Sequence, residues 1–225
     1  MIDADAFQAL LREKPTLVGR IHEFNYQPAR YIDPSHLTGW LEPGLLDSLA
    51  QSSRGLRELS RVILQRFKLA DRTCWDFSER RLLGLLPGPT LNGVLDYVAA
   101  AVCSRDIGRI IEKSARFELR EHLGPELLEF AVKRGPTLAS TGWPDDPRLS
   151  NQPWERITQV RQACVSCWLA GEPAAYRERM LLKLPAERTM NIPGDVSPVQ
   201  HELVWLVTRK LLRSDFREEW TACCA

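Results

Sequence analysis

The side chains best suited to acid–base chemistry near neutral pH are the four histidines: His22, His36, His122 and His201. The most enzyme-like carboxylates are Asp145 and Asp146, because all-helical isoprenoid enzymes use acid-rich motifs to hold magnesium. Both aspartates lie between prolines and have no third acid on the same helical face, and Asp beside Pro is ordinary turn chemistry. The spacing therefore favours a turn over a metal site.

Two further motifs resemble metal or redox sites and are incomplete. The segment HELVW begins like the zinc motif HExxH, but Trp205 occupies the position of the second histidine. Cys164 and Cys167 form a CxxC inside a segment that is predicted to be the middle of a helix, without the preceding strand of a thioredoxin motif. We predict buried structural thiols there, and exposed thiols at Cys223 and Cys224. No glycine-rich phosphate loop or nucleophile elbow is present, so we expect a protein that is not an enzyme and binds no cofactor or metal.

Charge argues weakly against a nucleic-acid partner. The chain of 225 residues has 30 Lys and Arg against 29 Asp and Glu, whereas dedicated duplex-DNA binders usually carry a basic excess. Three function classes remain open. An adaptor needs two separate binding faces, an enzyme or ligand-binding domain needs a pocket where Asp145, Asp146 and the histidines meet, and a DNA-binding regulator needs a one-sided basic surface.

The elements that position these residues are predicted to be helices, because apolar residues recur at three- and four-residue spacing. The expected helices are 3–14, 43–51, 55–69, 76–86, 89–103, 105–122, 125–134, 153–170, 173–182 and 198–221. We predict an all-α fold with one compact multi-helix domain over 1–225 and long Pro-rich loops, 136–153 being the candidate lobe boundary. The N-terminus is not a signal peptide, and the longest apolar run is far shorter than a membrane span, so we expect a soluble cytoplasmic protein.

Capping and helix-ending residues support several of the predicted helix ends. Asp76 to Glu79 and Ser197 to Gln200 both have the spacing of a capping box. Gly124 followed by Pro125 predicts one helix ending and the next beginning at once, and Gly171 predicts another helix end.

The segment FNYQPARYIDPSHL, residues 24–37, interrupts the helical pattern with two prolines and an aromatic-rich sequence. We predict that Tyr26, Tyr31 and Ile32 pack it onto the helical body. The remaining polar side chains would hydrogen-bond or face a partner. With the tryptophans in or beside the Pro-rich loop 135–153, the predicted partner-binding residues are Arg30, Asp33, His36, Trp143 and Trp154.

Two segments give the chain a resemblance to a known family. The first is FNYQPARYIDPSHL, which resembles a Phe-x-Pro-Ala-x-Tyr element near the start of the SctK (YscK-type) accessory proteins of bacterial type III secretion systems. The second is residues 156–185, which resemble that family's helix ending in Trp-Leu-Ala, its short Pro break, its aromatic-Arg helix and its Leu-x-Leu-Pro stop. In this sequence these are 168–170, Pro173, Tyr176 with Arg179, and 182–185. The middle of the chain, residues 107–135, also fits the family's run of short helices.

The resemblance implies a non-enzymatic adaptor of the cytoplasmic sorting platform. Family members bridge the cytoplasmic domain of an inner-membrane ring protein, of SctD type, and a pod protein, of SctQ type. The implied location is the cytoplasmic face of the inner-membrane secretion apparatus, without contact with nucleic acid and near the membrane only through a partner. The motifs are structural, so the resemblance transfers no individual contact residue.

Overall fold

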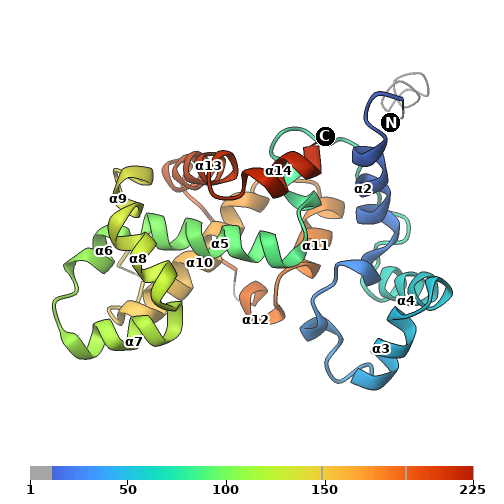
Figure 1. Ribbon diagram of the computed structural model, residues 1–225, viewed down its shortest axis with the longest axis horizontal. Coiled ribbons are helices and arrows are strands. Elements are labelled where there is room, and N and C mark those ends of the chain that lie inside the picture. The colour runs from blue at the N-terminus through green and yellow to red at the C-terminus, as the bar shows by residue number, and fades with distance from the viewer. Residues whose placement is uncertain (1–11, 148, 191, 225) are drawn as a thin grey trace. The chain divides into compact units, whose positions relative to one another are not determined.

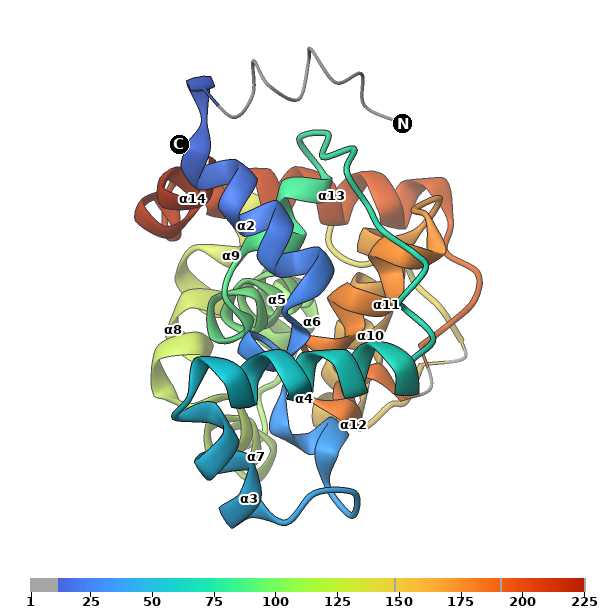
Figure 2. The same cartoon turned by 90° about the vertical axis from the view of Figure 1, so that its right-hand side faces the viewer.

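The computed structural model describes residues 12–147, 149–190 and 192–224, and its helices are shown in Figures 1 and 2. These residues form two compact units. Unit 1 comprises residues 1–91, 171–189 and 218–225, and unit 2 comprises 92–170 and 190–217. Residues 136–153 lie wholly within unit 2, and the single domain over 1–225 stays a prediction.

The elements of unit 1 are α2 (Pro15–Tyr26), η1 (Pro28–Arg30), η2 (Pro34–Leu37), α3 (Pro43–Ala50), α4 (Ser53–Arg66), η3 (Arg81–Leu85), α11 (Ala174–Leu182), α12 (Ala186–Thr189) and most of α14 (Arg217–Cys224). Helix α4 is amphipathic: Leu59 and Ile63 are buried, whereas Arg57 and Arg61 are exposed. It contacts both α2 and η1, and Figure 2 shows it crossing below the C-terminal end of α2. The packing of α2, η1 and α4 therefore fixes the start of the aromatic-rich segment.

The elements of unit 2 are most of α5 (Gly88–Val102), then α6 (Ser104–Arg109), α7 (Lys113–Leu123), α8 (Pro125–Lys133), α9 (Gly135–Leu138), α10 (Pro153–Leu169) and α13 (Pro198–Arg213). The stretch 98–102 of α5 is completely buried, as expected for a helix that is apolar on every side. The Asp96 carboxylate pairs with Arg161 of α10 at 2.9 Å. Trp168 Nε1 of α10 donates to Thr208 Oγ1 of α13 at 3.0 Å. These buried polar contacts define how α5, α10 and α13 pack.

The predicted all-α fold is confirmed, since the described residues contain helices and no strand. Most predicted helices are present to within a few residues, and Ser197 and Gln200 form both halves of the predicted capping box. Gly124 lies between α7 and α8 as predicted, at φ +79° and ψ +157°, a region open essentially to glycine alone. The predicted helix 3–14 falls almost entirely outside the described residues.

Four helix predictions were wrong. First, no helix was predicted over α2, which includes residues 24–26 of the segment that was expected to be non-helical. The second placed a capped helix over 76–86, where Arg81 instead binds both the carboxylate and the carbonyl of Asp76, and only the short η3 follows. The expected helix 105–122 is two helices, because the Arg116 guanidinium donates to the Ile110 carbonyl within the break. The expected helix 198–221 ends at Arg213, where the Ser214 hydroxyl turns back to the Lys210 carbonyl.

Candidate partner-binding surfaces

The aromatic-rich segment is held in unit 1 by two short 3₁₀ turns, η1 and η2, and by a buried aromatic ring. Tyr31 and Ile32 join the apolar cluster formed with α4, as predicted. The Tyr31 hydroxyl donates to the Phe24 carbonyl at 2.7 Å, and its burial raises the pKa of that hydroxyl. Tyr26 behaves differently. It is the last residue of α2, is 39% exposed, and its ring contacts those of His22 and Trp75.

Asp33 and His36 bind backbone groups at the end of α11. The Asp33 amide donates to the Leu182 carbonyl at 2.7 Å. His36 Nε2 lies 3.2 Å from the Leu181 carbonyl and 2.9 Å from the Leu184 carbonyl. Because both neighbours are acceptors, Nε2 must carry the proton. Both residues therefore already connect the segment to α11.

Arg30 is exposed and lines a hollow of about 280 Å³ in unit 1. The other lining residues are Gln27 at the end of α2 and Ser53, Leu56 and Arg57 in the first turns of α4. Two guanidinium groups border a hollow whose lining contains no carboxylate. Such a lining suits an anionic group, since Arg binds carboxylates and phosphates through a planar set of donors.

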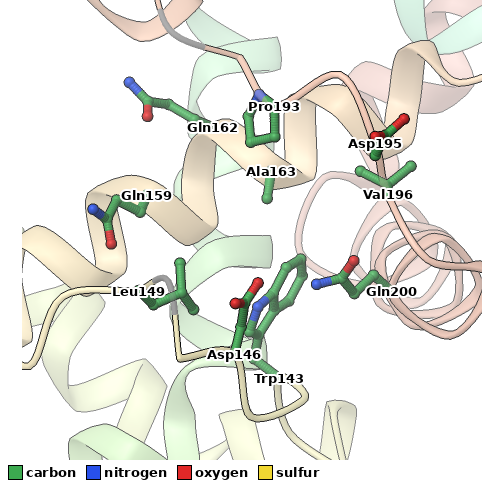
Figure 3. Close-up of a pocket in the computed structure, with 10 residues that line it drawn as sticks. All are labelled: Trp143, Asp146, Leu149, Gln159, Gln162, Ala163, Pro193, Asp195, Val196 and Gln200. Carbon is green, nitrogen blue, oxygen red and sulfur yellow. The ribbon is translucent and has the colours of Figure 1, made fainter.

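Trp143 lines a pocket of about 370 Å³ in unit 2, between the loop that follows it and the loop that precedes α13 (Figure 3). Trp143 is 7% exposed, its amide donates to the Val102 carbonyl at 2.8 Å, and its Nε1 has no hydrogen-bond partner among the described residues. Two glutamines of α10 hydrogen-bond to these two loops. Gln159 accepts from the Ser150 amide, and Gln162 donates to the Met190 carbonyl. Asp146 also lines this pocket.

Trp154 does not line that pocket and is half-buried at the start of α10. Its ring stacks on His122 with centroids 4.3 Å apart and planes 7° apart, and the Arg161 guanidinium lies 5.6 Å from its centroid. Of the five predicted partner-binding residues, Arg30, Asp33 and His36 thus belong to unit 1, and Trp143 and Trp154 to unit 2.

The geometry does not bring together the aspartates and histidines that the enzyme alternative requires. The pocket that contains Asp146 is lined by none of the four histidines. His36 is bound to carbonyls in unit 1, and His122 is stacked on Trp154 in unit 2. Across the described ranges, no three His, Cys, Asp or Glu side chains gather closely enough to hold a metal ion.

Of the predictions made for the thiols, that for the CxxC pair is correct and that for Cys223 is wrong. Cys164 and Cys167 are buried and free, as predicted, and burial raises the pKa of both, that of Cys167 to about 12. A thiol with a raised pKa is a poor nucleophile and metal ligand at neutral pH. Cys223, expected to be exposed, is instead buried and directs its Sγ toward the Leu85 carbonyl at 3.7 Å.

Sequence reasoning also missed two buried cations of the α11 segment. The Arg179 guanidinium donates to the carbonyls of Asn25, Leu69 and Ala175 at 3.0–3.1 Å. The Lys183 ammonium donates to the Leu86 carbonyl at 2.9 Å. Lys183 interrupts the apolar run 180–185, which is the sequence signal that it leaves, whereas Arg179 follows the charged pair Arg177 and Glu178 and leaves none. Within the part of the chain that the structure describes, every helix is too short or too polar to span a bilayer.

Comparison with known proteins agrees with the resemblance drawn from the two motifs. A family model described as the YOP proteins translocation protein K (YscK) matches residues 20–220. No curated protein and no solved structure gives a match. Because the model covers most of the sequence, the chain belongs to the YscK family and is a protein of the type III secretion machinery.

Proposed function

We propose that the protein is a non-enzymatic adaptor of the type III sorting platform. It links the cytoplasmic domain of an SctD-type inner-membrane ring protein to an SctQ-type pod protein, at the cytoplasmic face of the inner-membrane apparatus. Membership of the YscK family is the observation that carries this proposal. The division into two compact units supports it, because each unit then supplies a surface for one partner.

The contacts of the chemistry-bearing residues also support a binding role. The CxxC thiols are buried, His36 is bound to backbone carbonyls, and His122 is stacked on a tryptophan. Arg30 and Trp154 retain exposed surface, one in each unit, and we propose them as contacts to different partners. Asp33 and His36 then position the segment that presents Arg30, and Trp143 supports the loop on its side of unit 2.

The test is reconstitution from purified components. The protein is mixed with an SctD-type cytoplasmic domain and an SctQ-type protein, singly and together, and the masses of the complexes are measured by light scattering. The expected result is two binary complexes and one ternary complex. Arg30→Glu should weaken one binary complex and Trp154→Ala the other, because like-charge contact and the loss of an aromatic anchor both reduce affinity. Failure to form any complex would refute the adaptor role, and competition between the two partners would refute separate surfaces.

A further inference from the structure

A groove of about 370 Å³ lies against α6, α7 and α8 in unit 2. The turn at Gly124 joins α7 directly to α8, which lie side by side in Figure 1. The apolar part of the groove includes Leu119 of α7 and the stripe of Leu128 and Val132 on α8. A different stripe of α8, formed by Leu127 and Phe130, is buried. Helix α8 is thus apolar on two faces, and only one of them belongs to the core.

Two further large apolar side chains of the same stretch of chain are exposed. Ile111, in the break before α7, is 89% exposed, and Phe117 of α7 is 66% exposed. These are the two largest exposures among the big apolar side chains in the described ranges. Val132 inside the groove is 47% exposed. An exposed apolar groove that is rimmed by polar residues is typical of a protein-binding site.

The rim of the groove is basic. It carries Arg116, Arg120 and Lys133 against a single acid, Glu129. Lys133 pairs with Glu129 at 2.5 Å, whereas Arg116 donates, among the residues that the structure describes, only to the Ile110 carbonyl, which carries no charge. Arg120 is exposed on the same side. The groove therefore presents two guanidinium charges that its own acid does not neutralise.

We propose that this α7–α8 groove docks an amphipathic helix of a partner protein, with acidic residues flanking the apolar stripe of that helix. The proposal rests on the adaptor function, because the occupant is then a component of the secretion apparatus. The nine residues of α8 span about 13 Å. This length accommodates roughly two to three turns of a helix, whose apolar residues fill the groove while its acids meet Arg116 and Arg120.

Charge selects a partner protein over a second copy of this chain. A symmetric dimer through the groove would bring Arg116 and Arg120 of the two copies close together. Like charges across an interface oppose association, whereas an acidic helix gains from both guanidinium groups. If the partner helix is acidic, its affinity for the groove should fall as the salt concentration rises.

The test compares two groove variants with two matched controls. Val132→Asp puts an acid into the apolar surface, and Arg120→Glu reverses a rim charge. Their controls, Val199→Asp and Arg209→Glu, make the same changes at exposed positions of α13, also in unit 2. Affinity is measured by titration calorimetry against the SctD-type domain and the SctQ-type protein. Each groove variant should weaken binding to the same one of the two by tenfold or more, and each control should stay within about twofold. Circular dichroism confirms that all variants fold.

The outcomes separate this proposal from the adaptor function. If the wild-type protein binds neither partner, the adaptor function fails and the groove proposal falls with it. If the wild type binds both and the groove variants bind as tightly, the groove proposal alone is wrong.

Photo-crosslinking from Val132→benzoylphenylalanine, inside the groove, then identifies the occupant in the reconstituted complex. Capture of an acidic amphipathic helix is the expected result, whereas capture of a strand or a basic segment would contradict the proposal. A dimer of this chain alone that Val132→Asp dissociates would also overturn it, because a second copy would then fill the groove.

Discussion

Lys183 places an amine in an apolar site and thereby couples the stability of unit 1 to pH. Its side chain is almost completely buried, and its ammonium lies 4.8 Å from the centroid of the Tyr31 ring and 5.4 Å from that of Phe24. Within the described part of the chain its one hydrogen bond is to the Leu86 carbonyl, although an ammonium has three donors. Burial lowers the pKa of Lys183 from 10.5 to about 7, a shift that the more distant charge of Glu23 opposes.

The sign of the effect follows from which state holds the proton. Between pH 7 and 10.5 the unfolded chain keeps Lys183 protonated, while the folded chain has lost that proton. The free energy of unfolding should therefore rise with pH across this window, by about 1.4 kcal/mol per pH unit. Below pH 7 both states are protonated, so the full penalty of burying the charge, about 5 kcal/mol, is present and constant.

Replacing Lys183 by Met removes this penalty and keeps a flexible side chain against the two rings. The substitution also leaves the Leu86 carbonyl without its donor, which costs about 1–3 kcal/mol at every pH. At pH 7 and below, Lys183→Met should accordingly be more stable than the wild type by about 2–4 kcal/mol. At high pH the wild type should be the more stable protein, and the two curves should cross between about pH 8 and 10.

The assay is urea unfolding followed by far-ultraviolet circular dichroism, from pH 6 to 10.5. Comparing variants at the same pH cancels the titration of groups that they share. Lys210→Met is the matched control, because the Lys210 ammonium also donates to a carbonyl, that of Leu138 at 3.1 Å, but is exposed. Its difference from the wild type should not reverse sign with pH. Parallel curves for Lys183→Met and the wild type would refute a buried amine with a lowered pKa.

Two further pairs of substitutions test the packing of the first segment and the turn of the α7–α8 groove. Tyr31→Ala should destabilise the protein by about 3–5 kcal/mol and Tyr31→Phe by about 1–2 kcal/mol, measured by urea unfolding. An unchanged melting temperature for Tyr31→Ala, with loss of binding to the SctQ-type protein, would instead show that Tyr31 is a contact residue. Gly124→Ala should cost about 1–3 kcal/mol, because the backbone there is at φ +79°. Gly19→Ala, in the open middle of α2, should be stabilising by about 0.5–1 kcal/mol, and equal effects at the two glycines would contradict the argument.

Helix ends with a complete local signal were predictable from the sequence. Ser197 and Gln200 satisfy each other three residues apart, and Gly124 followed by Pro125 ends one helix and starts the next. The similar spacing at Asp76 failed, because Arg81 binds the carboxylate that the capping box would have used and the carbonyl that would have accepted the first hydrogen bond of the helix. Arg81 is itself held by Glu172, which lies 91 residues further along the chain. A local rule cannot register that Arg81 is oriented by Glu172, in the loop between α10 and α11.

The roles of the polar residues in the first segment were harder to predict for the same reason. His36 has the sequence context of an exposed loop residue, but its acceptors lie 145 and 148 residues away. The burial of Lys183 likewise depends on the rings of Phe24 and Tyr31, which come from the first segment. Residue types and spacing gave the apolar packing of Tyr31 and Ile32, whereas the hydrogen-bond partners depended on tertiary structure.

The first motif on which the family resemblance was drawn meets the part of the second motif that lies in unit 1, from residue 171 on, whereas residues 156–170 belong to unit 2. Besides the bonds of Asp33 and His36 to the end of α11, the Ser35 hydroxyl accepts from the Ala186 amide at 2.8 Å. The Lys183 ammonium of the second motif also lies over the Tyr31 ring of the first. These contacts explain why both motifs consist of prolines, aromatic residues and small helix-capping residues rather than catalytic groups. Each motif supplies the surface on which the other packs and the partners of its hydrogen bonds. Substitutions at this junction should therefore act first on folding, and partner specificity should reside in exposed surfaces such as Arg30 and the α7–α8 groove.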